Sequence, residues 1–339
     1  MNRRYNRDQL SCSLGTRRWK YLSLVTLWML EVAGRTQGRT ANTMSGILVT
    51  GAAGFIGRHT CSELRRHSLQ FVGIDVGGSD EVRVCDLADR SAVSSLLRFH
   101  EFDAIIHLAA ILPSASAADP LLATRVNISA AITLLHEAIS SGVRRFVFGS
   151  STSVYGFAGV TVPVSEDIPA APSDVYGAAK RFVEIVGENL NARQAIEFSA
   201  LRIATVVGPG ARNTSSPWRS DIFEKLGTGV AQQITLPYDG QDLLTVVHVE
   251  EVARMLKTMV CADSLTSCTY NTPAELCSAK DLKGMVEAAD PDVQVVLTER
   301  RRPLAPLADG TNFATEFSFE TPSLASRLEK AARKGGTKR

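Results

Sequence analysis

A tyrosine and a lysine stand four residues apart in the run Tyr-Gly-Ala-Ala-Lys, at Tyr176 and Lys180. On a helix, residues at i and i+4 share a face, so this phenol and this ammonium would point into the same site. There the ammonium would lower the pKa of the phenol, which could then exchange a proton with a substrate hydroxyl near neutral pH. Of the six tyrosines, Tyr176 is the one followed by a lysine at this spacing. The pair predicts acid–base chemistry at an alcohol or carbonyl group.

A group of hydroxyl side chains lies in residues 149–156, Gly-Ser-Ser-Thr-Ser-Val-Tyr-Gly, directly after an apolar run at 145–148. In doubly wound parallel sheets, ligands bind at the edge where such runs end. The hydroxyl of Ser151 could hold a substrate oxygen beside Tyr176, with Thr152 next to it. A serine-rich turn without a role in catalysis is the alternative interpretation.

A glycine-rich turn, Thr-Gly-Ala-Ala-Gly-Phe-Ile-Gly, occupies residues 50–57 between an apolar run and a helical pattern. Glycines at such a place allow a tight turn, close approach of a pyrophosphate and close packing of the helix on the strand. The start of the helix supplies N–H donors and the positive end of its dipole. The turn therefore predicts a dinucleotide site, whose residues would be Gly51, Ala53, Gly54, Phe55, Ile56 and Gly57.

Asp75 ends the second apolar run, 18 residues after Gly57, where a carboxylate can accept the 2′-hydroxyl of an adenosine ribose. Its alternative role is that of a turn residue before Gly77. The carboxylate would repel a 2′-phosphate, and residues 76–79 contain no arginine to bind one. The sequence therefore favours NAD over NADP.

These groups need a scaffold in which apolar runs alternate with helical patterns. The predicted strands are residues 47–50, 71–74, 82–85, 104–108, 145–148 and 198–203. The predicted helices between them are residues 55–67, 91–100, 123–141 and 174–192. Near-continuous apolar strands separated by helices indicate an α/β protein with a Rossmann-type, doubly wound parallel sheet.

The alternation ends after Gly208-Pro209-Gly210, where residues 211–245 are rich in loop-forming types. A strand at 245–249 and a helix at 250–261 follow. We therefore expect an NAD-binding domain over residues 44–207 and a smaller C-terminal substrate lobe over 208–330, interleaved with the core sheet. A basic tail would occupy residues 331–339 and a separate leader residues 1–43.

Together these motifs resemble an extended short-chain dehydrogenase/reductase, and within that class the NAD-dependent epimerase/dehydratase family. The resemblance covers about residues 46–260 and includes His-Leu-Ala-Ala at 107–110 and Leu-Arg at 201–202. It implies a Rossmann domain with a small substrate lobe, paired as a homodimer through two long helices.

The resemblance also assigns roles to single residues. It implies a catalytic triad of Ser151, Tyr176 and Lys180, in which Lys180 also holds the nicotinamide ribose. Asn127 matches an asparagine that organises the proton relay, although an asparagine bonded to the helix backbone is the alternative. The further cofactor-binding residues that it implies are Asp86, Leu87, Leu108, Ala109 and Ala110.

Positions at which this chain differs from the family reduce the number of reactions that it could catalyse. Family dehydratases carry Thr-Asp-Glu where this chain has Ser-Thr-Ser at 151–153, so an acid and base for removing water are missing. Nucleotide-sugar epimerases place asparagine at Thr205 and Arg-Asp at Leu244-Thr245. That arginine binds a nucleotide diphosphate, so its absence weakens the case for a nucleotide sugar.

The substrate contacts are the hardest residues to assign. The set that we predict is Ser151, Thr152, Thr205, Arg212 and Trp218. Arg219 and the run 300–302 are further candidates, but Arg212 and Trp218 rank first because they lie on the loop expected to close over the site.

The reaction that we expect is NAD-dependent hydride transfer at a secondary alcohol or ketone carbon of a sugar, sugar acid or similar small molecule. The alternative is a sugar or nucleotide-sugar epimerase with tightly bound NAD. A non-catalytic NAD-binding regulator is a third class, against which the complete Ser/Tyr/Lys set argues.

Composition and charge exclude several other classes. The chain has 339 residues, 45% hydrophobic and 21% charged, as in an ordinary globular protein. Residues 44–339 carry 29 basic and 33 acidic side chains, so we expect no nucleic-acid partner. The apolar run 22–30 is too short to span a bilayer.

The basic leader has a net charge of +6 over residues 1–43. We interpret it as an upstream extension of a cytoplasmic enzyme whose natural start is Met44; an export signal is the alternative. The six cysteines form no C-x-x-C pair and have few histidines nearby, which predicts a reducing compartment and no metal site.

Overall fold

The computed structural model describes residues 46–79, 81–156, 162–211, 216–299 and 304–336. The leader 1–43, Arg212 and the run 300–302 lie outside the described residues.

Within the described residues, seven strands form one parallel sheet in the order β10-β6-β5-β4-β1-β2-β3. The strands are β1 Ile47–Thr50, β2 Phe71–Asp75, β3 Val82–Val84, β4 Ala104–His107, β5 Arg145–Ser151, β6 Glu197–Ile203 and β10 Thr269–Asn271. The central strands are buried because helices cover both faces. This arrangement confirms the predicted Rossmann-type fold, and its strand order reverses between β1 and β4, the place where ligands bind in such sheets.

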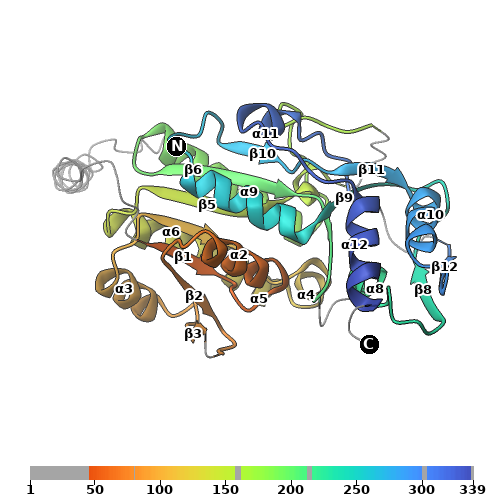
Figure 1. Ribbon diagram of the computed structural model, residues 1–339. Coiled ribbons are helices and arrows are strands. Elements are labelled where there is room, and N and C mark those ends of the chain that lie inside the picture. The colour runs from red at the N-terminus through yellow and green to blue at the C-terminus, as the bar shows by residue number, and fades with distance from the viewer. Residues whose placement is uncertain (1–45, 80, 157–161, 212–215, 300–303, 337–339) are drawn as a thin grey trace, which may run out of the picture. The chain divides into compact units, whose positions relative to one another are not determined.

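Two layers of helices enclose the sheet (Figure 1). On one face α2, Phe55–Arg66, packs beside α9, Val249–Cys261. On the other, α3, Arg90–Phe99, packs on α6, Ala131–Ser140, which packs on α7, Val175–Ala192. The layers fix which side chains face the carboxyl edge of the sheet.

The helix predicted over residues 123–141 is instead a broken helical segment that begins earlier. It consists of α4 Pro113–Ala118, α5 Pro120–Ala123, the π-helix η2 Thr124–Ala130, and α6. Prolines open both α4 and α5 because a missing N–H costs nothing in a first turn. Asp119 caps α5 by accepting a hydrogen bond from the Leu122 N–H at 2.9 Å.

Strand β5 continues three residues beyond its predicted end at 148. Gly149, Ser150 and Ser151 pair with Leu201, Arg202 and Ile203 of β6. The serines therefore belong to the edge of the sheet, and a short 3₁₀ helix, η3 Thr152–Tyr155, follows them.

The described part of the C-terminal half contains a three-stranded sheet and a two-stranded sheet. The strands are β7 Thr205–Val207, β8 Gln232–Leu236, β9 Leu243–His248, β11 Glu275–Ser278 and β12 Val293–Leu297. The helices are α8 Trp218–Glu224, α10 Ala279–Ala289, α11 Thr311–Glu316 and α12 Leu324–Gly336. Because β10 returns to the large sheet, this lobe and the Rossmann core are interleaved in the chain. The helix α12 takes in residues 331–336 of the expected tail, and its Leu328 is buried in the core of the lobe.

Candidate active site

The glycine-rich turn lies between β1 and α2, where added side chains would collide with backbone. Gly51 has φ +69°, and a Cβ there would lie 2.7 Å from the Ala109 nitrogen. A Cβ on Gly57 would overlap the carbonyl oxygen of Gly51. Gly54 is the N-cap of α2 and offers no side chain to the first N–H groups of the helix. The cradle therefore fits a pyrophosphate held by backbone N–H groups, with Ala53, Phe55 and Ile56 completing the turn.

Thr50 fixes the second wall of this cradle. Its Oγ1 accepts hydrogen bonds from the N–H groups of Leu108 at 3.2 Å and Ala109 at 3.3 Å. The same hydroxyl shares a hydrogen bond with His107 Nδ1, 2.7 Å away, so His107 fixes its orientation. Burial, and then the charge of Lys180, lower the pKa of His107 to about 3, so the ring is neutral. Thr50 was not among the predicted site residues, although a polar residue at the end of a buried strand indicates a position at the ligand-binding edge of the sheet.

Asp75 lies at the end of β2 beside the turn. Its Oδ2 accepts a hydrogen bond from the Ala53 N–H at 3.1 Å, and its Oδ1 accepts one from the Gly77 N–H at 3.4 Å. The carboxylate is thus held next to the predicted dinucleotide cradle. Farther along the edge, Leu87 is buried and Asp86 lies 3.7 Å from Arg125. Ala110 continues the partly exposed segment after β4.

Ser151, Tyr176 and Lys180 meet at the carboxyl end of β5. The Ser151 hydroxyl, which donates to Ser153 Oγ at 3.1 Å, lies near enough to the phenol of Tyr176 to act on its pKa. Lys180 Nζ donates to the carbonyl oxygen of Gly149 at 2.7 Å and lies 5.6 Å from the centre of the Tyr176 ring. Asp174 fixes the start of α7 by accepting the Gly177 N–H at 2.6 Å. The structure thus brings the three predicted catalytic residues together.

Burial dominates the electrostatics of the pair. It raises the pKa of Tyr176 to about 12, with Asp174 adding to the rise, while Arg219 and Ser151 act in the opposite direction. Burial also lowers the pKa of Lys180 to about 7, against the effect of Glu184. The expected lowering of the phenol pKa by Lys180 was therefore wrong for this arrangement, because desolvation of the phenol outweighs nearby charges.

Asn127 lies in η2 and uses its amide to hold one backbone segment. Its Oδ1 accepts the Ile111 N–H at 2.7 Å, and its Nδ2 donates to the Ile111 carbonyl at 2.9 Å. It therefore anchors the segment after β4 and not its own helix backbone, and its part in a proton relay stays a prediction. Two predicted substrate contacts, Thr152 in η3 and Thr205 in β7, are buried.

Trp218 is part of a core and not of a loop over the site, which corrects its ranking as a substrate contact. Its side chain is 2% exposed, and its ring meets Tyr238 edge-on at 5.6 Å between centroids. The next residue, Arg219, is the arginine whose charge acts on Tyr176. The Arg219 guanidinium lies 5.9 Å from the centre of the Trp218 ring, so the buried tryptophan packs beside this cation.

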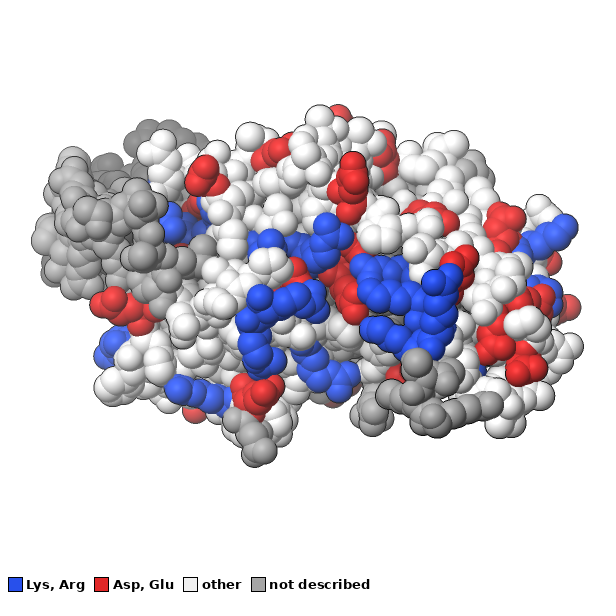
Figure 2. Space-filling model, viewed as in Figure 1, with Lys and Arg blue, Asp and Glu red and all other residues white. Residues whose placement is uncertain are grey.

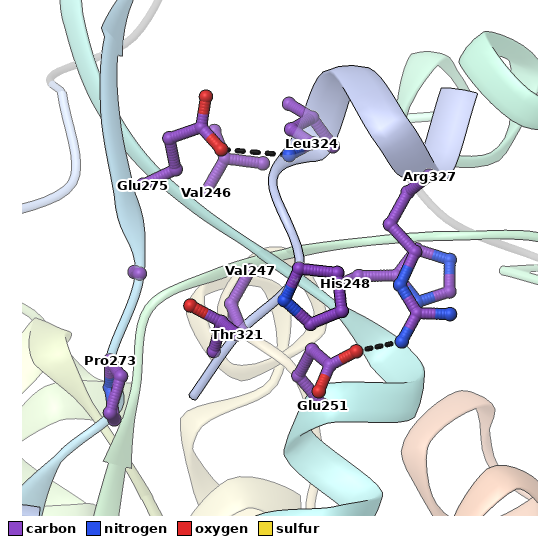
Figure 3. Close-up of a pocket in the computed structure, with 11 residues that line it drawn as sticks. Val246, Val247, His248, Glu251, Pro273, Glu275, Thr321, Leu324 and Arg327 are labelled. Atoms are coloured by element: carbon purple, nitrogen blue, oxygen red, sulfur yellow. Dashed lines mark hydrogen bonds and ion pairs between the residues drawn. The ribbon is translucent and has the colours of Figure 1, made fainter. Parts of the chain in front are cut away.

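Charged side chains and a small pocket mark the region of α12. Figure 2 shows Lys and Arg gathered over α2 and α12, with acidic side chains between them. Figure 3 shows a pocket between β9, β11 and α12, where Arg327 pairs with Glu251 and the Leu324 N–H donates to Glu275 at 2.8 Å. The lining of this pocket contains none of the predicted site residues. Among the described residues, no helix has the length and apolar character needed to cross a bilayer.

Comparisons with known proteins agree with this geometry. Residues 47–271 match the model of the NAD dependent epimerase/dehydratase family. The chain is 34% identical over 162 residues to the UDP-glucose 4-epimerase of Bacillus subtilis (strain 168), covering 43% of this chain and 48% of that protein. The chain spans about half the length of the first curated relatives that it matches.

Solved structures share the fold over most of the chain. The L-threonine dehydrogenase of Phytophthora infestans matches with a TM-score of 0.79 and 21% identity, covering 87% of this chain and all of that one. MoeE5 in complex with UDP-glucuronic acid and NAD matches with a TM-score of 0.72 and 27% identity, covering 85% and 99%. The chain belongs to the NAD-dependent epimerase/dehydratase family.

Proposed function

We propose that this protein transfers hydride between NAD and the secondary alcohol or ketone carbon of a sugar or sugar acid. The observation that carries the proposal is the meeting of Ser151, Tyr176 and Lys180 at the carboxyl end of β5, where Ser151 acts on the phenol and Lys180 lies on the next turn of α7. In this arrangement an alcohol oxygen would bind between the serine hydroxyl and the phenol.

Each of the residues at the site would have its own role in binding or proton transfer. The turn from Gly51 to Gly57 would hold the pyrophosphate of NAD, and Asp75 the adenosine ribose. Bound NAD supplies the hydride acceptor. Ser151 would orient the substrate oxygen, and Tyr176 would take or give its proton. Because burial raises the pKa of the phenol to about 12, Tyr176 is protonated in the free protein and is ready to act as an acid on a ketone.

The small lobe favours a substrate without a nucleotide. Leu244 and Thr245, where nucleotide-sugar epimerases carry Arg-Asp, are both 3% exposed. Leu244 is part of the hydrophobic core of the lobe, so this position cannot present a cation to a diphosphate. Arg219 is the cation of the lobe that acts on Tyr176, and a guanidinium suits a carboxylate. This supports a sugar acid as the substrate.

A nucleotide-sugar epimerase is the second candidate. It is supported by the curated relatives named UDP-glucose 4-epimerase and by MoeE5, solved with UDP-glucuronic acid and NAD. An epimerase would retain its cofactor and return the hydride to the opposite face of the sugar. Dehydration is not proposed, because the Ser-Thr-Ser at 151–153 lacks an acid and a base.

The experiment that separates the candidates is a panel of sugars, sugar acids and UDP-sugars incubated with the protein and NAD. The absorbance of NADH and the composition of isomers are followed together. Net NADH formation with a sugar acid supports the proposed dehydrogenase. Conversion between UDP-sugar isomers without net NADH contradicts it and supports the epimerase.

We also propose a homodimer formed through α7 and the neighbouring helical segment. Apolar side chains are exposed there, at Phe182 and Ile185 on α7 and at Leu121 on α5, and the two helices pack beside one another. Light scattering should give the mass of a dimer, and Phe182→Glu should give a monomer.

A cytoplasmic location is proposed for the enzyme. The cysteines within the described residues are all free thiols, namely Cys61, Cys85, Cys261, Cys268 and Cys277. Free thiols of this number are typical of a reducing compartment. Fractionation of cells that express the full chain checks this expectation.

A further inference from the structure

Glu184 is a buried carboxylate that the proposed mechanism does not use. It follows Tyr176 and Lys180 at i+8 and i+4 on α7, so the three side chains share one face of the helix. Its side chain is fully buried. A buried carboxylate is retained at a large desolvation cost unless hydrogen bonds and opposite charges offset that cost.

The carboxylate of Glu184 accepts hydrogen bonds from three side chains. The Ser150 hydroxyl donates to Oε1 at 2.6 Å. Arg202 donates to Oε1 at 3.1 Å and to Oε2 at 2.9 Å, and Arg181 donates to Oε2 at 3.1 Å. The contact with Ser150 ties α7 to the strand residue immediately before Ser151.

These bonds place Glu184 in a larger buried group that we call the Glu184 network. Its members are Ser150, Tyr155, Glu184, Arg202 and Asn271. Arg202 donates to the Tyr155 hydroxyl at 2.9 Å, and that hydroxyl donates to Asn271 Oδ1 at 2.9 Å. The network thereby joins α7 to β5, β6 and β10 directly behind the proposed catalytic residues.

Three consecutive residues of β5 each hold one residue of the shared face of α7. Ser151 lies beside the phenol of Tyr176 and acts on its pKa. The Gly149 carbonyl accepts from Lys180, and Ser150 donates to Glu184. Glu184 therefore forms the third of three contacts that align the helix with the edge of the sheet.

Lys180 is a buried cation whose ammonium is held by two contacts. Its ammonium lies 4.6 Å from the centre of the Phe148 ring and meets the Gly149 carbonyl. Charged and titratable side chains occur on every strand and on most helices packed around Lys180. They are Tyr176, Arg181, Glu184 and Glu188 on α7, His107 on β4, Arg145 on β5, Tyr155 on η3, Glu197 and Arg202 on β6, Arg125 on η2, and His136 and Glu137 on α6. Burial lowers the pKa of Lys180, and Glu184 is the group in this set that raises it.

We propose that Glu184 is a positioning residue that keeps Lys180 protonated and in register with β5. The catalytic importance of Lys180 rests on the proposed function. The charge of Lys180 can be measured without turnover. Arg202 and Arg181 share the same carboxylate, so Glu184 is a single anion among three cations when Lys180 is included.

The test measures the ionisation of Lys180 in the full chain without cofactor or substrate. Lysine labelled with ¹³C at Cε reports each amine by NMR, and Lys180→Arg identifies its signal. In Glu184→Gln the pKa of Lys180 should fall by about 1 pH unit or more, the effect of removing a neighbouring opposite charge. Glu184→Asp keeps the charge and should restore most of the value.

Glu188→Gln is the matched control. The same chemical change then lies one turn farther from Lys180 along α7, where Glu188 pairs with Arg181 at 2.6 Å. It should leave the Lys180 titration unchanged. If Glu184→Gln does not fold because Arg202 loses its partner, Glu184→Gln with Arg202→Gln removes both charges. The shift should keep its direction there, because the carboxylate of Glu184 raises the pKa of Lys180 and is absent from this variant too.

Activity provides the second readout once a substrate is known. The alkaline limb of kcat/KM should move to lower pH in Glu184→Gln, whereas a purely structural role would lower the rate equally at every pH. An unshifted Lys180 titration in either folded variant overturns the proposal. If no substrate supports turnover, the proposed function fails while the NMR titration still decides the role of Glu184.

Discussion

At the scale of single residues, the phenol of Tyr176 is the group whose removal separates chemistry from binding. Tyr176→Phe keeps the buried ring and removes the proton donor. We expect turnover to fall about a hundredfold or more, since that is the usual effect of losing a general acid or base. The affinity for NAD, measured by quenching of protein fluorescence, should stay unchanged because the phenol acts on the substrate. Near-normal turnover in this variant would remove Tyr176 from the mechanism.

Asp75 is the second single residue for which we make a prediction: we expect it to decide the choice between NAD and NADP. Asp75→Ala removes a carboxylate that would accept ribose hydroxyls and repel a phosphate, so NAD should bind worse and NADP relatively better. The measurement is the ratio of kcat/KM with the two cofactors. A basic residue at position 76, Val76→Arg, should move the ratio further toward NADP.

Asp75→Asn is the control for this change. An asparagine can still accept the Ala53 N–H, which lies 3.1 Å from Asp75 Oδ2, but it carries no charge. Its ratio should lie between those of the wild type and Asp75→Ala if repulsion sets the preference. A wild-type ratio that favours NADP would contradict the assignment of Asp75.

At the scale of elements, two glycines in helices should respond in opposite ways to alanine. A Cβ on Gly57 in α2 would lie 2.8 Å from the Ala52 Cα and overlap the Gly51 carbonyl, so the turn would have to shift. A Cβ on Gly284 in α10 would meet nothing within 4 Å. We expect Gly57→Ala to lower the free energy of unfolding by about 1–3 kcal/mol. Gly284→Ala should raise it by about 0.5–1 kcal/mol.

Urea denaturation of the two variants checks both signs in one experiment. Gly57→Ala should also weaken NAD binding, because the same turn forms the cradle, whereas Gly284→Ala should leave NAD binding unchanged. Equal stability of the two variants would mean that the turn tolerates side chains that the geometry excludes.

At the scale of the whole molecule, buried histidines make stability depend on pH. Burial lowers the pKa of His107 to about 3, and burial followed by Arg327 lowers the pKa of His248 to about 4. An unfolded histidine has a pKa of about 6.5, so the unfolded chain binds more protons below that value. Stability is therefore fully present above about pH 6.5 and is lost as the pH falls toward the folded values.

The slope should approach about 1.4 kcal/mol per pH unit for each histidine that stays neutral in the fold. His107→Asn leaves an acceptor for the Thr50 hydroxyl and removes one titrating group. Urea denaturation between pH 7 and pH 5 should then show a shallower loss of stability than in the wild type. An identical slope would show that His107 takes up its proton in the folded protein.

The order of elements and the main motifs follow from the sequence by itself. The apolar runs at 47–50, 104–108 and 198–203 became strands of the predicted parallel sheet, and the Tyr176/Lys180 spacing placed both side chains on one helix face. These features depend on neighbours within a few residues, because strand patterns, glycine turns and i,i+4 pairs are local.

The tertiary structure alone decided which side chains are buried and which charges meet. Trp218 and Arg219 are adjacent in sequence, but packing of α8 buries the tryptophan and leaves the arginine to act on Tyr176. Glu184 and Arg202 pair across two elements, and burial determines that the phenol pKa rises. Desolvation and ion pairing are sums over residues far apart in the chain, so no local pattern carries them.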